Sequence, residues 1–308
     1  MFRDQIFSLT ILLFFDEKSN AFDEPKNKQL RMKRYLCTGI IAIGLLSCGL
    51  NKSLTKQLAN EPFQQALADT LLAYALDHEA LYTLADTLKP VSSVKFLRYS
   101  IAKDSTQHDG DITIATRDSL LKKIRDYQQV CHMLSEGDWQ FVLTPFNRTE
   151  KNIRNMEIYV VRKSVFAKKI RQHQHFFGQW GFTPNASPAV VLSVIEYETK
   201  LDRNRAFGYL FGYPPHAVDF FVEAAKLQNA DTSKPLVKRD FFSIPVFAKA
   251  TGYFTYAVPK GYKATPVDST IYKAATQTLQ RYKVARAKFS QTKNVDALKL
   301  WRYLIDKN

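Results

Sequence analysis

Two histidines that are separated by one residue are the first candidates for chemistry in this chain. His173 and His175 are followed by Glu196, and two imidazoles with a carboxylate form a ligand set that zinc and similar metals accept. On a helix, side chains at i and i+2 face apart, and no HExxH-type spacing is present. An extended backbone would bring both rings to one face. The alternatives are therefore a metal site or histidines that are solvated or hydrogen-bonded without a metal.

A second candidate is the segment 203–221, which is rich in glycine, proline and aromatic residues. Gly208 and Gly212 permit close approach of another backbone. Pro214 and Pro215 end one helix and can begin the next. A helix N-terminus flanked by Arg and Tyr can hold an anion. The residues expected at this ligand-binding corner are Arg203, Arg205, Tyr209, Tyr213, His216 and Asp219, the last two in the first turn of the new helix.

The alternative is a helical corner in which glycines and aromatic rings merely pack together, because aromatic residues at helical spacing are usually core residues. The Gly212-Tyr213-Pro214 sequence is similar to corners in uncharacterised bacterial proteins, and that resemblance implies no activity.

A basic run near the end of the chain is a candidate surface for anionic lipid or glycan. Its members are Arg281, Lys283, Arg286, Lys288 and Lys293. The whole chain has a formal net charge of +15, which favours anionic partners such as headgroups, acidic glycans or nucleic acid. A solvated helix surface is the simpler interpretation of the run, since charge runs usually belong to exposed faces.

Motifs of the common nucleotide-using enzymes and serine hydrolases are absent: there is no Gly-x-Ser-x-Gly, no phosphate loop and no Gly-x-Gly-x-x-Gly. No cofactor and no nucleic-acid partner are expected. The free thiol at Cys131 is predicted to be a small buried hydrophobe. His132 beside it points in another direction on a helix and is not expected to activate it.

Helices separated by scattered strands are expected to position these residues. The periodicity predicts helices over 61–78, 79–88, 117–135, 164–177, 187–200, 267–289 and 295–305, and a helical corner over 203–227. Strands are predicted over 94–101, 139–146, 156–162, 241–248 and 252–258. In the first helix, one face is expected to carry Phe63, Leu67, Leu71, Tyr74 and His78. This order favours an α+β fold, helix-rich with a small mixed or antiparallel sheet, over a regular βαβ array.

The beginning of the chain has the composition of an export signal. Lys33 and Arg34 follow Met32, an apolar stretch of eleven residues runs from Leu36 to Leu46, and Ser47-Cys48 comes next. Such a stretch is too short to span a bilayer as a helix. The tetrapeptide Leu45-Leu46-Ser47-Cys48 resembles the lipobox of bacterial lipoprotein signal peptides.

This resemblance implies a thioether-linked diacylglycerol on Cys48, cleavage before it, and an acylated new amine, so that several acyl chains hold the protein at a membrane. Gly49 follows where an inner-membrane retention signal would have Asp, and no acidic cluster comes after it. The resemblance therefore implies an outer-membrane lipoprotein that faces the periplasm, if the cell has two membranes. Residues 1–31 fit a signal poorly and are interpreted as a mis-called start or an extended leader.

The predicted organisation is a signal peptide over 32–47, a lipidated tether over 48–60 and one globular exported domain over 61–308. From Cys48 onward the net charge remains +13, because residues 1–47 carry seven Lys or Arg and five Asp or Glu. The function expected is a membrane-anchored binding or structural domain of the cell envelope with an anionic partner. The alternative is an envelope hydrolase, metal-dependent or not, with a site near His173, His175, Glu196 and His216.

Overall fold

The computed structural model describes residues 62–101, 117–150, 153–230, 233, 235–249, 254–291 and 294–306. The signal peptide, Cys48, the tether and Lys293 lie outside these residues. The helices are α3 (Pro62–Asp77), α4 (Leu81–Leu84), α5 (Arg117–Leu134), α6 (Lys163–Gln172), α7 (Gln174–Phe177), the 3-10 turn Gly178–Trp180, α8 (Pro188–Glu196), α9 (Lys200–Leu210), α10 (Pro215–Ala230), α11 (Pro266–Phe289) and α12 (Ala297–Asp306). The strands are β1 (Val91–Tyr99), β2 (Trp139–Glu150), β3 (Ile153–Arg162), β4 (Arg239–Ile244), β5 (Phe254–Pro259), β6 (Ser290–Gln291) and β7 (Asn294–Val295).

The described strands form small antiparallel sheets among many helices, so the predicted α+β class is confirmed. The main sheet has the order β1-β3-β2, with β2 and β3 joined as a hairpin. A second hairpin pairs β4 with β5. Side chains alternate along β3, so Glu157 and Tyr159 share one face while Met156 and Ile158 share the other.

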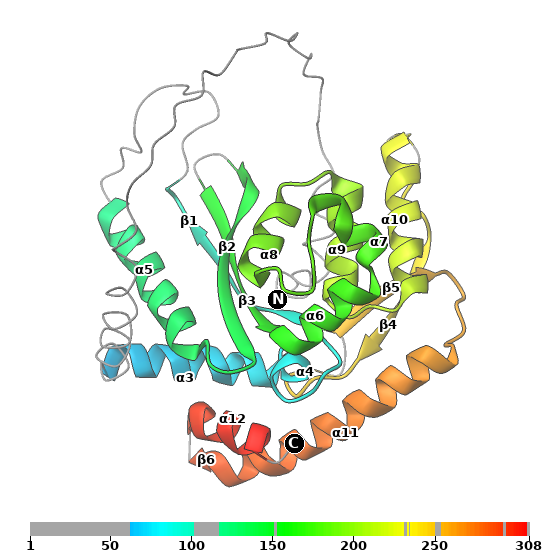
Figure 1. Cartoon of the computed structure of the whole chain (residues 1–308). Helices are drawn as coiled ribbons and strands as arrows, with labels where there is room; N and C mark the ends of the chain where they lie inside the picture. The colour runs from blue at the N-terminus through cyan, green and yellow to red at the C-terminus, as the bar shows by residue number, and fades with distance from the viewer. Residues whose placement is uncertain are drawn as a thin grey trace, which may run out of the picture.

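Helices cover both faces of the main sheet (Figure 1). On one side, the Tyr159 ring stacks with Phe207 of α9, and α6 to α9 gather there. On the other side lies α5, in which Ile124, Val130, Cys131 and Leu134 are buried. The predicted burial of Cys131 is confirmed, and burial raises the pKa of its thiol to about 12. This thiol is therefore protonated and packed at neutral pH.

Helices α11 and α12 lie along the lower edge of the molecule in Figure 1 and are tied to α3. Asp77 at the end of α3 accepts hydrogen bonds from Tyr282 and from Arg286, at 2.6 and 2.8 Å. The backbone N–H of Leu298 in α12 donates to Asp69 at 3.1 Å. These bonds attach the last helices to the first described helix. No described helix is both long and apolar enough to cross a membrane.

The predicted apolar face of the first helix was right only in part. Leu71 is buried and Leu67 packs against the core, but Phe63 and Tyr74 are 60% and 47% exposed. The other buried residues of α3 are Gln64, Ala68, Leu72, Ala75 and Leu76. The reason is that α3 packs against β1 and α5 on one side and α12 on the other, and small alanines allow the close approach. The predicted helix over 79–88 is shortened to α4, because the chain must turn after Leu84 to enter β1.

Candidate functional site

The two histidines of the predicted metal site lie where α6 gives way to α7. His173 breaks the predicted helix over 164–177, since its backbone leaves the helical region at the end of α6. Its ring stacks on Tyr209 of α9, with centroids 3.8 Å apart, and it lies 6.3 Å from the ring of His175. Burial, with the nearby charge of Lys169, lowers the pKa of His173 to about 4. At neutral pH this histidine is an uncharged ring in an aromatic stack.

Glu196, the carboxylate proposed to complete that metal site, has other partners. It ends α8, is 2% exposed, and lies 3.7 Å from the guanidinium of Arg203. It also accepts the backbone N–H of Asn147 at 3.3 Å. Across the part of the chain that the structure describes, no group of three or more His, Cys, Asp or Glu residues could hold a metal ion.

The predicted helical corner forms as expected in its backbone. Helix α9 ends at Leu210 and α10 begins at Pro215, so His216 and Asp219 lie in its first turn or just after it. Gly212 has a φ of +78°, and a Cβ there would lie 2.4 Å from the backbone oxygen of Leu88. A Cβ on Gly208 would lie 2.9 Å from Val218 of α10. Gly212 therefore permits the close backbone approach that the sequence predicted, while Gly208 makes room for the side chain of Val218.

The six residues proposed for the ligand-binding corner are divided among four places. Arg203 turns into the core towards Glu196. Arg205 donates to Asp219 at 2.6 Å and to the hydroxyl of Tyr209 at 3.3 Å, so its charge is met by a carboxylate. Tyr213 is buried against Phe254 and Tyr256, and His216 faces the loop before α11.

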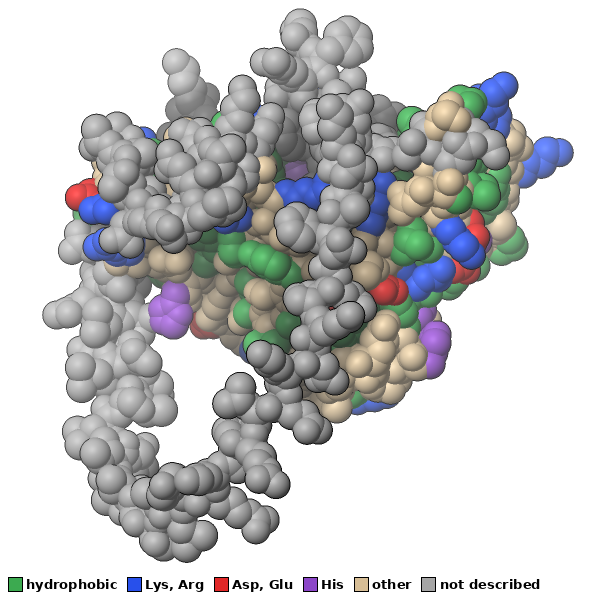
Figure 2. Space-filling view, turned by 90° about the horizontal axis from the view of Figure 1, so that it is seen from above, with side chains coloured by type: hydrophobic (Ala, Val, Ile, Leu, Met, Phe, Trp, Pro, Cys, Tyr) green, Lys and Arg blue, Asp and Glu red, His purple; other side chains and the backbone are tan. Residues whose placement is uncertain are grey.

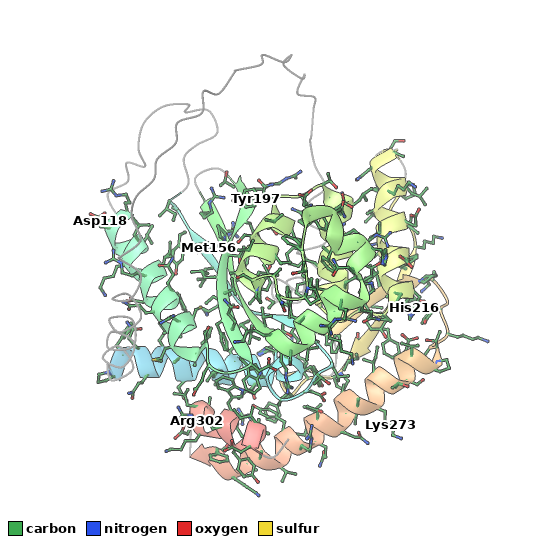
Figure 3. The ribbon with its side chains drawn as sticks, viewed as in Figure 1. Asp118, Met156, Tyr197, His216, Lys273 and Arg302 are labelled. Atoms are coloured by element: carbon green, nitrogen blue, oxygen red, sulfur yellow. The ribbon has the colours of Figure 1, made fainter. Side chains whose placement is uncertain are left out.

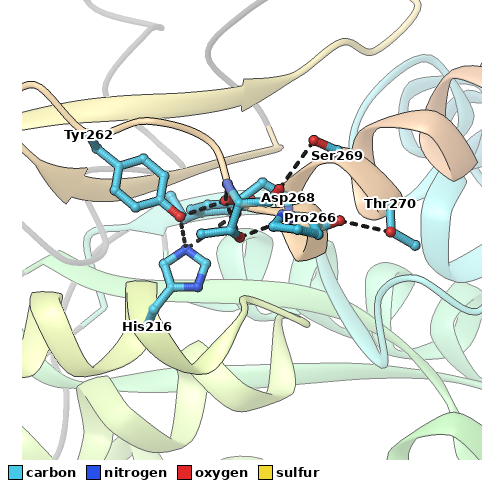
Figure 4. Close-up of polar contacts among 8 residues, drawn as sticks. His216, Tyr262, Pro266, Asp268, Ser269 and Thr270 are labelled. Carbon is cyan, nitrogen blue, oxygen red and sulfur yellow. Dashed lines mark hydrogen bonds and ion pairs between the residues drawn. The ribbon is translucent and has the colours of Figure 1, made fainter.

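The contacts of His216 form the most elaborate polar cluster at the corner (Figure 4). Its Nε2 lies 2.8 Å from the Tyr262 hydroxyl and 3.2 Å from a carboxylate oxygen of Asp268. Tyr262 and Tyr256 each donate to Asp268 at 2.6 Å. Because the hydroxyl proton of Tyr262 is used towards Asp268, Nε2 of His216 is the donor in the His216–Tyr262 bond. Nδ1 is then the ring nitrogen left to accept a proton, and the imidazole is 31% exposed.

Asp268 is the centre of this cluster and also completes the capping box of α11, whose N-cap residue is Thr265. It is fully buried and accepts the backbone N–H and the hydroxyl of Thr265, both at 2.7 Å, while Thr265 in turn caps the helix. Burial alone would raise the pKa of Asp268, but the hydrogen bonds from Tyr256, Tyr262 and Thr265 lower it to about 2. The carboxylate is therefore ionised at neutral pH and holds His216 in one tautomer.

Sequence reasoning missed Asp268, Tyr256 and Tyr262. The sequence Thr265-Pro266-Val267-Asp268 is the signature of a capped helix start, so the cap itself was detectable. The contact of this capped helix start with His216 was not detectable. Tyr262, which contacts both His216 and Asp268, is 46 residues from His216 in the sequence, and only the fold brings them together.

A buried polar layer between the main sheet and α9 was also missed. Glu157 and Tyr159 on β3 and Thr144 on β2 are at most 2% exposed, and each has a polar atom without a hydrogen-bond partner among the described residues. Burial raises the pKa of Glu157 to about 8, although a hydrogen bond from Ser93 opposes the rise. Glu157 is thus a mostly protonated carboxyl group at neutral pH.

We expect Glu157→Gln to remove a pH dependence from the free energy of unfolding. The ordinary pKa is 4.5 and the folded value is about 8, so the folded state holds one more proton between these values. Stability then falls as pH rises through that window, by about 1.4 kcal/mol per pH unit at most. Urea unfolding at pH 5 and pH 8 measures the difference. The exposed change Glu223→Gln is the control, and an unchanged slope in Glu157→Gln contradicts the assignment.

In comparisons with known proteins, no protein-family model, no curated protein and no solved structure matches this chain.

Proposed function

We propose that this protein is exported as a bacterial lipoprotein and is held at a membrane by lipid on Cys48. The observation that carries the proposal is the order of residues 32–48: a basic start, a short apolar stretch, and Leu45-Leu46-Ser47 before the cysteine. Several acyl chains on one residue bind a membrane far more firmly than a single chain does. By the same resemblance the protein lies at the outer membrane and faces the periplasm.

The folded domain acts as a binding or structural component of the cell envelope with an anionic partner. Its net charge of +13 from Cys48 onward supports this partner class. Glu196 and Arg205 are engaged within the protein and His173 packs in an aromatic stack, so the support for an anionic partner is the net charge and not these residues.

Replacing Cys48 by alanine is expected to abolish lipid labelling and release the exported protein from membranes. The thiol is the only attachment point that the lipobox provides, so no acyl chain can be added without it. Metabolic labelling with a radioactive fatty acid, followed by fractionation, measures both effects. Cys37→Ala is the matched control, since this cysteine lies within the signal and should leave labelling intact. Lipid labelling that persists in Cys48→Ala is incompatible with the proposal.

A second candidate function is an envelope hydrolase that would use His173, His175, Glu196 and His216. The observation that favours it is the His216–Asp268 pair, because an imidazole oriented by a buried carboxylate can act as a general base. Purified protein can be incubated with isolated cell wall and with simple acyl esters. Hydrolysis that is lost in His216→Gln and kept in the exposed control His132→Gln would favour the enzyme over the binding domain.

A further inference from the structure

Helices α11 and α12 present a basic outer surface, which we call the α11–α12 face. Its cationic side chains are all exposed: Lys273, Arg281, Lys283, Lys288 and Arg302. Figure 3 labels Lys273 on α11 and Arg302 on α12, both of which lie along the lower edge of the view. Of the predicted basic run, Arg286 is the exception, because it forms an ion pair with Asp77.

Few carboxylates offset these charges. Helix α11 has a single acidic residue, Asp268, and it is fully buried. Around the face, Asp77 is paired with Arg286 and Asp296 with Lys299, while Asp86 accepts a hydrogen bond from Thr278. The opposite, upper face also has cations, but Figure 2 shows red acidic side chains close to blue ones at several places there. The α11–α12 face therefore has an excess of cations, and Asp306 at the end of α12 is the exposed carboxylate among the described residues of these two helices.

Apolar and aromatic groups lie among these charges. A cavity of about 370 Å³ opens between the two helices, lined by Arg281, Val284, Ala285, Tyr303 and Leu304 among others. Val284 is 54% exposed and Tyr272 is 44% exposed. Cations with interspersed aliphatic and tyrosine side chains are typical of surfaces that contact the headgroup region of a bilayer.

This face also lies next to the point where the tether enters the fold. Helix α12 packs on α3, with Leu298 bonded to Asp69. Pro62, the first described residue, precedes Asp69 by seven residues of helix. This corresponds to a distance of about 10 Å along the helix axis. The chain from Cys48 thus enters the domain beside α12, and a membrane at the lipid is within reach of the α11–α12 face.

We propose that the α11–α12 face lies against the headgroups of anionic phospholipids in the membrane that holds the protein, with Arg281 and its cavity receiving a headgroup phosphate. This inference rests on the lipoprotein proposal above and adds the orientation of the domain. A bilayer is favoured over an acidic glycan because exposed aliphatic and tyrosine groups accompany the charges and because the tether begins beside them.

The experiment uses the mature lipidated protein in vesicles of phosphatidylcholine alone or with added phosphatidylglycerol. Lysines are modified with an amine-reactive reagent and quantified by mass spectrometry. Lys273, Lys283 and Lys288 are expected to be protected several-fold in the vesicles that contain phosphatidylglycerol, and high salt is expected to remove the protection. Lys122 on α5 and Lys226 on α10, which are exposed on helices outside the α11–α12 face, are expected to react equally in both kinds of vesicle.

The double change Lys273→Glu and Lys283→Glu is expected to remove the protection of Lys288, since each cation near an anionic bilayer contributes roughly fivefold to affinity. The matched control is the double change Lys122→Glu and Lys226→Glu, which should leave the protection of Lys288 unchanged. Equal labelling of these lysines in both vesicle types overturns the inference. Protection of the lysines by soluble polygalacturonate, but not by phosphatidylglycerol, also overturns it.

Failure of the lipid anchor is detected by a separate measurement, flotation: protein that carries no lipid does not float with vesicles of phosphatidylcholine alone.

Discussion

Replacing Gly212 by alanine is expected to lower the free energy of unfolding by about 4 kcal/mol, among the largest effects of any single methyl group in this protein. A new Cβ would lie 2.4 Å from the Leu88 backbone oxygen and 3.3 Å from Pro90, so the backbone must move. The φ of +78° adds the strain that a side chain suffers in the left-handed region. Thermal unfolding should show a decrease of about 10 °C in Tm.

Gly181→Ala is the control that separates the two causes. Gly181 also has a positive φ, of +72°, but nothing lies within 4 Å of a Cβ built there. Its substitution should cost only about 1–2 kcal/mol, which is the conformational contribution alone. Equal losses of stability in the two variants would mean that Leu88 does not pack against Gly212.

The second large effect is expected for Lys89, which follows Leu88 at the same junction. Lys89 is fully buried, donates to Glu79 at 2.7 Å, and lies 4.4 Å from the centroid of the Phe254 ring. Its replacement by methionine leaves the carboxylate of Glu79, which is 4% exposed, without its cation. Removing one partner of a buried ion pair costs about 3–5 kcal/mol, and urea unfolding measures this loss.

The double variant Lys89→Met with Glu79→Gln is expected to recover most of that stability. With both charges removed, no uncompensated ion remains in the core, and methionine fills the space among the aromatic rings. The difference between the double variant and the sum of the single variants reports the coupling of the pair. If the double variant is as unstable as Lys89→Met, the buried carboxylate is not the cause of the loss.

The regular elements were the most predictable part of the fold. Hydrophobic periodicity located α5 and α11 within a residue or two, because each has a long stripe that faces one side of the core. For α3 the buried face was assigned only in part: Leu71 is buried, but neighbours on both sides also bury alanines that carry little signal in the sequence. The Gly-Pro pattern indicated the corner between α9 and α10, because glycine and proline restrict the backbone locally.

The candidate site was predictable only in part, for a related reason. His216 was located at a helix start from the prolines before it, but its partners Tyr262 and Asp268 come from a distant loop and helix. Likewise, the sequence cannot show that Arg203 turns towards Glu196 while Arg205 turns towards Asp219. Local signals place residues on elements, and long-range packing then decides which side chains meet.

The most direct measurement is the intact mass and N-terminal sequence of the protein isolated from its own membranes. The proposal predicts a chain that begins at Cys48, with a mass increased by a diacylglycerol on the sulfur and with an N-terminus blocked by a further acyl group. A chain that begins at Met1 or Met32, with an unmodified thiol at position 48, would contradict the lipoprotein assignment and the membrane orientation that depends on it.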